Sequence, residues 1–141
     1  MEITGSCHCG DISYTLDWGS DPESIPARAC DCSFCRKHGG LWTSSPTGAL
    51  EVRVRPGGAG DYRFGTGSAR FHVCRRCGAV PVVTSEIEGR TYAVVSVRAM
   101  DNVAPDRIQE AAASFGEEDL AARLARRTRG WIPVVRFVEL P

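Results

Sequence analysis

The sequence predicts a mainly β protein with a short helical segment near its C-terminus. Several short runs alternate apolar and polar residues, or are rich in β-branched and aromatic side chains, as half-buried strands are. The 15 glycines and 8 prolines are typical of many turns between short strands. Seven cysteines form three short motifs, which indicates metal sites that fasten such turns together.

The predicted strands are bounded by glycine, proline or charged residues. Six segments fit the pattern: residues 12–16, 50–54, 71–73, 80–84, 92–97 and 134–138. Because Pro81 has no backbone N–H to donate, its strand is expected at the edge of a sheet. The glycine-rich segments 56–61 and 65–68 are expected to be loops.

The region before the last strand is expected to be helical. Residues 105–113 place a proline in the first turn of a short helix. Residues 117–127 place acids first and arginines last, which matches the helix macrodipole, and Gly130 is expected to stop this helix. Its arginines are interpreted as solvated charge, with a partner-binding patch as the alternative: Arg123, Arg126, Arg127 and Arg129.

Length and charge favour a single domain, residues 1–141, that does not bind nucleic acid. The 17 basic and 17 acidic residues balance, so no overall field attracts a polyanion. The N-terminus lacks the basic and apolar regions of a signal peptide, and no apolar run reaches membrane-spanning length. A cytoplasmic protein is therefore expected, in which clustered cysteines bind metal or react as thiols rather than forming disulfides.

The cysteine motifs can bind two zinc ions. The motifs are Cys7-His8-Cys9-Gly10, Cys30-Asp31-Cys32-Ser33-Phe34-Cys35 and Cys74-Arg75-Arg76-Cys77-Gly78. Pairing the first motif with the third gives a closed four-sulfur site, which is a structural arrangement. Such a site contributes roughly 10 kcal/mol or more of apparent folding free energy.

The middle motif is left with three sulfurs, those of Cys30, Cys32 and Cys35, and no fourth cysteine. Zinc with three protein ligands carries water or substrate in its fourth position, as in catalytic sites. A thiol bound there would be deprotonated and held as a nucleophile. As an alternative, His38 closes this site and leaves it without chemistry.

Two further alternatives remain open for the cysteines. Some of them can be buried small apolar side chains, although seven in three spaced groups argue against this. Cys74 and Cys77 also have the spacing of a redox pair, but no βαβ pattern surrounds them.

The three motifs together resemble the glutathione-dependent formaldehyde-activating enzyme family, whose members are zinc-binding S-(hydroxymethyl)glutathione synthases. Residues 5–12, 30–37 and 70–78 carry the resemblance in order and spacing. It is strongest over residues 1–101, and residues 102–130 are a divergent helical insertion. The resemblance implies coiled antiparallel sheets around a structural zinc, similar to the fold of methionine-R-sulfoxide reductases.

The resemblance also implies roles for individual residues. Cys7, Cys9, Cys74 and Cys77 would hold the structural zinc, and Cys30, Cys32 and Cys35 a catalytic one. The implied activity is that of a carbon–sulfur lyase or synthase joining a thiol such as glutathione to formaldehyde or another small aldehyde.

Three residues near the middle motif have open roles. Arg36 and Lys37 either attract the carboxylates of glutathione or are solvated surface charge. Trp42 either walls a pocket or is a core aromatic.

Two other functions compete with the synthase. The first is a non-catalytic binding module with two structural zinc ions. The second, a methionine sulfoxide reductase relative, requires a redox cysteine outside the three motifs, and the sequence has none.

Overall fold

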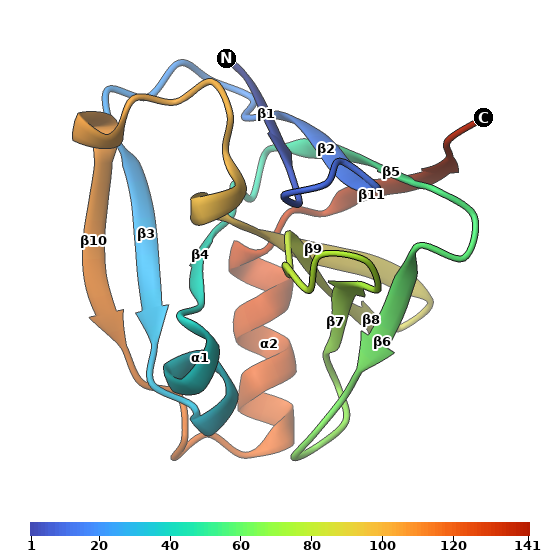
Figure 1. Cartoon of the computed structure of the whole chain (residues 1–141). Helices are drawn as coiled ribbons and strands as arrows, with labels where there is room; N and C mark the ends of the chain where they lie inside the picture. Colours follow the sequence, from blue (N-terminus) through green and yellow to red (C-terminus); the bar gives the residue numbers. More distant parts are fainter.

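The computed structural model describes all 141 residues and contains two β-sheets, so the predicted mainly β class is confirmed (Figure 1). The smaller sheet has the order β1 (Glu2–Ser6), β2 (Ile12–Asp17), β5 (Ala49–Val54), β11 (Val134–Glu139). The larger sheet has the order β10 (Ile108–Ala113), β3 (Ile25–Cys30), β4 (Leu41–Thr43), β9 (Arg90–Ser96), β8 (Val82–Ile87), β7 (Arg70–Cys74), β6 (Ala59–Tyr62). The α-helices are α1 (Ser33–His38) and α2 (Leu120–Gly130), and the 3₁₀ turns are η1 (Val97–Ala99) and η2 (Pro105–Arg107).

Most neighbouring strands are antiparallel, but two pairs are parallel. Strand β10 runs parallel to β3, and β11 runs parallel to β5. In Figure 1, β10 and β3 stand together on one side of the molecule, and α2 lies between them and the group β6, β7 and β8. No helix is both long and apolar enough to cross a membrane.

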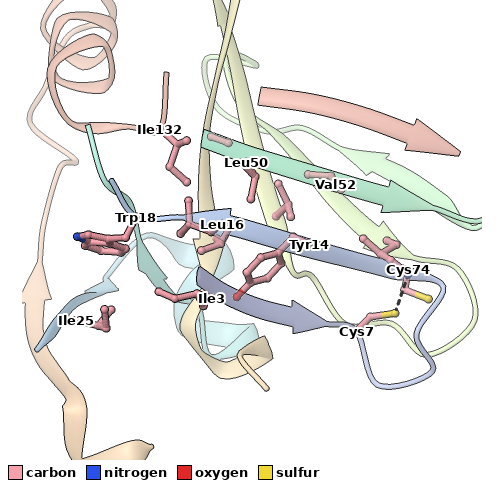
Figure 2. Packing of buried hydrophobic residues seen from close by; sticks show 14 residues of the cluster. Ile3, Cys7, Tyr14, Leu16, Trp18, Ile25, Leu50, Val52, Cys74 and Ile132 are labelled. Carbon is pink, nitrogen blue, oxygen red and sulfur yellow. Dashed lines mark hydrogen bonds between the residues drawn. The ribbon is translucent and has the colours of Figure 1, made fainter. Parts of the chain in front are cut away.

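The main core contains the buried faces of both sheets. In β2, Ile12, Tyr14 and Leu16 alternate with partly exposed residues and are fully buried, as the period-two pattern predicts. They belong to one apolar cluster with Val82 and Val95 from the larger sheet. Figure 2 shows this cluster, with the sulfur-bearing side chains of Cys7 and Cys74 at one end of it. Each large aliphatic side chain buried here contributes about 1.5–3 kcal/mol.

The helix predicted for residues 105–113 is wrong. Only Pro105–Arg107 is helical, as one 3₁₀ turn, and Ile108–Ala113 forms a strand. This strand pairs with β3 along its whole length, from Ile108 opposite Ile25 to Ala113 opposite Cys30. Hydrogen bonding to the open edge of β3 outweighs the local helical preference of the alanines.

The expectations for Pro81 and for residues 56–61 also need correction. Strand β8 begins at Val82, one residue after the proline, and lies between β9 and β7 in the interior of the sheet. Pro81 still takes part through its carbonyl, which accepts a hydrogen bond from the N–H of Ser96 at 2.8 Å. The second half of the expected loop forms β6, which pairs with β7.

The second predicted helix is confirmed with shifted ends. Helix α2 begins after Asp119, whose side chain accepts a hydrogen bond from the N–H of Ala122 at 2.8 Å, and it ends at Gly130. The interpretation of its arginines as solvated is wrong for Arg127, which is only 6% exposed. Strands β1, β3 and β4 and helix α1 lay outside the predicted elements.

We expect Gly5→Ala to destabilise the protein by about 1–3 kcal/mol, because overpacking a filled core costs energy of this size. A Cβ at Gly5 would lie 2.4 Å from the ring of Tyr14, the residue opposite it in β2. That ring is fully buried, and its hydroxyl donates to the carbonyl of Ser96 at 2.9 Å, so it has no room to move.

Urea denaturation would measure the effect. Gly116→Ala is the matched control, since a Cβ there meets nothing within 4 Å. Equal stability of the two variants would contradict the packing described for β1 and β2.

Candidate metal centre and substrate cavity

The first and third cysteine motifs meet in one four-sulfur cluster. Cys7 and Cys9 lie in the turn between β1 and β2, while Cys74 ends β7 and Cys77 follows in the next turn. The Cys7 and Cys9 sulfurs are 3.8 Å apart, and those of Cys9 and Cys74 are 3.5 Å apart. Around a tetrahedral zinc at about 2.3 Å from each sulfur, neighbouring sulfurs are about 3.8 Å apart. The donor set and its spacing therefore fit a tetrahedral metal ion.

The backbone of each turn supports these sulfurs. The N–H of Ile12 donates to the Cys7 sulfur at 3.2 Å, and the N–H of Cys77 donates to the Cys74 sulfur at 3.4 Å. Such hydrogen bonds favour the thiolate over the thiol. Gly10 and Gly78 have φ angles of 87° and 80°, which side-chain-bearing residues rarely adopt, so the turns need glycine there.

The middle motif forms a separate three-sulfur cluster. Cys30 ends β3, Cys32 caps α1, and Cys35 is the buried residue of that helix. The N–H of Cys35 donates to the Cys32 sulfur at 3.4 Å, and the indole N–H of Trp42 donates to the Cys35 sulfur at 3.4 Å. Two of the three sulfurs therefore receive an N–H donor.

Interactions among the sulfurs place negative charge in both clusters. Hydrogen bonding with Cys35 lowers the pKa of Cys30 to about 5, and the same interaction raises the pKa of Cys35. Burial acts to raise the pKa of Cys77, but hydrogen bonds from the N–H groups of Ala79 and Cys9 and from neighbouring thiols lower it to about 6. A lowered pKa favours the thiolate, which is the form of cysteine that binds metal.

The structure bears on the alternatives left open by the sequence. The close group of the middle motif contains three sulfurs and does not include His38, which is exposed and packs against Phe34 at 4.7 Å between ring centroids. Cys74 and Cys77 share their cluster with Cys7 and Cys9 instead of standing alone as a redox pair. All seven cysteines are free thiols in the two clusters, and none is left over.

A cavity of about 110 Å³ lies beside the three-sulfur cluster. Cys30, Cys32 and Cys35 all line it, so a ligand in the cavity would contact the sulfurs directly. Its walls are mainly apolar and include five aromatic side chains from strands and connecting segments: Trp42, Phe64, Phe71, Phe115 and Trp131. Such a surface excludes water, and the low local dielectric constant strengthens the electrostatic interactions of charged groups at its edge.

Trp42 fulfils both of its predicted roles. It is a core aromatic, 6% exposed, and it also forms part of the cavity wall. Arg36 and Lys37, by contrast, lie on the exposed surface of α1 and are not among the residues that line the cavity. Their contact with a substrate carboxylate stays a prediction.

Apart from Cys30, Cys32, Cys35 and Trp42, no residue of the cavity wall was assigned to the site from the sequence. The unassigned residues include Arg28, Phe115, Arg126, Arg127 and Trp131. Arg28 lies two residues before Cys30 in β3 and therefore on the same face, so a prediction of this strand would have found it. The other four are brought to the cavity by α2 and its flanking turns, which only the tertiary fold determines.

A second groove, of about 600 Å³, shares Trp42 with the cavity. It is lined by polar groups that include His8, His38, Arg98 and Asp101, but by none of the three cysteines of the middle motif. Since chemistry at those sulfurs requires direct contact, the smaller cavity is the candidate active site.

The fold and the site define a β-rich protein with two sulfur clusters, one of which opens on an aromatic cavity. The sequence profile of the glutathione-dependent formaldehyde-activating enzyme family matches residues 2–118. The chain belongs to this family, which is a family of enzymes.

A solved structure supports the fold. The chain is similar to a Rhodobacter sphaeroides protein of known crystal structure, with 28% sequence identity and a TM-score of 0.57. The match covers 73% of this chain and 92% of the other. The likeness to methionine-R-sulfoxide reductases inferred from the sequence stays a prediction.

We expect Cys7→Ser and Cys32→Ser to have different effects. Cys7 joins two distant turns at the end of the main core, so its loss should remove bound metal and unfold much of the protein. Cys32 lies at the start of a short helix, so its loss should remove one metal per chain while the fold persists.

Metal analysis together with circular dichroism would separate the two effects. Equal loss of structure in both variants would show that both clusters are structural.

Proposed function

We propose that this protein joins a small thiol such as glutathione to formaldehyde or another small aldehyde, with zinc bound at both sulfur clusters. The reaction adds the thiol sulfur to the aldehyde carbon, and the thiol proton ends on the former carbonyl oxygen. This makes the enzyme a carbon–sulfur lyase or synthase. The observation that carries the proposal is that Cys30, Cys32 and Cys35 lie together on the wall of a cavity.

A zinc ion held by these three cysteines would supply Lewis acidity, which would lower the pKa of a thiol that binds next to it. Side chains around the three cysteines set the environment of the reaction. Trp42 fixes the Cys35 sulfur through its indole N–H, and the aromatic walls keep water away from the reacting atoms.

Two hydroxyl groups that line the cavity are candidate proton donors. Thr66 and Ser68 both line it, and their oxygens are 2.6 Å apart. A hydroxyl there can protonate the oxygen of the aldehyde as the carbon–sulfur bond forms, after which the proton of the incoming thiol replaces the one donated.

The second candidate is a binding module with two structural metal sites. The four-sulfur cluster fits a structural role on its own, because its ligands are complete. The two functions differ in whether the other metal accepts an external ligand.

We expect glutathione to change the visible absorption of the cobalt-substituted protein in a saturable way, since cobalt reports the number of sulfurs around it. Cys32→Ser should abolish the change. Aldehyde addition would then be followed by the loss of free thiol.

Two cobalt ions per chain with no spectral response to glutathione, nor to a small neutral thiol such as 2-mercaptoethanol, would contradict the open site. That outcome would favour the binding module.

A further inference from the structure

Two arginines beside the three-sulfur cluster, one buried and one partly buried, have no carboxylate partner. Arg127 and Arg28 both line the cavity, and neither takes part in any of the ion pairs of the structure. Burying an unpaired guanidinium is costly, so such groups are normally compensated by an anion.

Arg127 is the more buried of the two, at 6% exposed. Its Nη1 donates to the carbonyl and hydroxyl oxygens of Ser68 and to the hydroxyl of Ser85, all of which are neutral acceptors. Its Nε is buried and has no acceptor at all. Burial and the nearby Arg126 lower the pKa of Arg127 to about 10, which leaves it charged at neutral pH.

Arg28 projects from β3 on the same face as Cys30. Its only hydrogen bond joins Nη2 to the hydroxyl oxygen of Ser44 at 3.0 Å. The remaining donors of the guanidinium fork are therefore available to a ligand in the cavity.

No carboxylate lines the cavity to offset this charge. The charged side chains that line the cavity are Arg28, Arg126 and Arg127, together with the cysteines. The carboxylate of Glu118, just before α2, already accepts two hydrogen bonds from Arg126 Nε and one from its Nη2, and it lies 3.9 Å from Arg123 Nε. The negative charge of Glu118 is therefore largely compensated by Arg126 and Arg123.

The size of the cavity limits what it can enclose. At about 110 Å³ it is well below the roughly 300–1,000 Å³ of pockets that surround a drug-sized ligand. It fits a molecule of a few non-hydrogen atoms, or one end of a larger molecule.

We propose that the cavity binds a carboxylate of the substrate between Arg127 and Arg28, next to the reactive sulfurs. This inference rests on the proposed function and narrows it, because the neutral substrate formaldehyde has no such group. The carboxylate belongs either to the aldehyde, as in a 2-oxo acid such as glyoxylate, or to the thiol. Planar guanidinium groups match a carboxylate with two parallel hydrogen bonds.

A competing account is that the arginines only offset the negative charge of the thiolates. In that case they would strengthen the binding of every thiol and aldehyde to the same degree. A carboxylate site instead discriminates between otherwise similar molecules.

The test uses two matched pairs of ligands on the zinc-loaded protein. The thiol pair is 3-mercaptopropionate and 3-mercapto-1-propanol, and the aldehyde pair is glyoxylate and glycolaldehyde. Dissociation constants would be measured by tryptophan fluorescence, because Trp42 and Trp131 line the cavity. For the two thiols, the visible absorption of the cobalt-substituted protein gives a second measure of binding.

We expect the carboxylate member of one pair to bind about tenfold more tightly or better, as for other charge-assisted hydrogen bonds. The pair that shows the preference identifies which substrate carries the carboxylate.

Arg127→Gln and Arg28→Gln should each reduce the preference, and Arg127→Lys should retain part of it. Arg28→Gln keeps the test valid if Arg127→Gln does not fold. Arg129→Gln, an exposed charge on the same helix, should leave the preference unchanged.

Equal binding of both members in both pairs would overturn the proposal, as would a preference that survives both glutamine variants. Equal weakening of both members in the variants would support simple charge compensation instead. Failure of the proposed function is seen separately, as a cobalt spectrum that no thiol changes.

Discussion

The four-sulfur cluster is the constraint on which the two-sheet arrangement depends. It joins the turn after β1 to the turn after β7, and Cys9 and Cys74 are 65 residues apart in the chain. Cys7 and Cys74 also belong to the main apolar core, so the cluster closes one end of the space between the sheets. A metal ion there would bind the folded chain far better than the unfolded one, and its binding energy would add to folding.

The second sulfur cluster packs into a different part of the protein. Cys35 belongs to an apolar cluster with Trp42, Phe71 and Trp131, apart from the main core that contains Cys7 and Cys74. This separation allows one site to stabilise the fold while the other faces a cavity. A ligand-binding site built from a strand end and a short helix can thus exchange ligands without opening the main core.

The segment after the family match shapes the cavity. The matched region ends at residue 118, whereas Arg126, Arg127 and Trp131 lie beyond it. The shared part of the chain therefore carries both sulfur clusters. Helix α2 adds charge to one of them, and Trp131, directly after the helix, adds an aromatic wall. Arg127 stacks over Trp131 at 4.9 Å and Arg126 over Phe115 at 3.6 Å, so the cations of the helix are held in place by the wall itself.

The sequence by itself determined the cysteine pattern, the mainly β class and the existence of α2, because motif spacing, residue alternation and helix capping are local properties. It also allowed Cys7 and Cys9 to be paired with Cys74 and Cys77. Only the tertiary structure decided that Ile108–Ala113 is a strand, since the open edge of β3 outweighs a local preference for helix. It alone placed Arg127 beside the three sulfurs, because burial of a charged residue depends on contacts between segments that are distant in the chain.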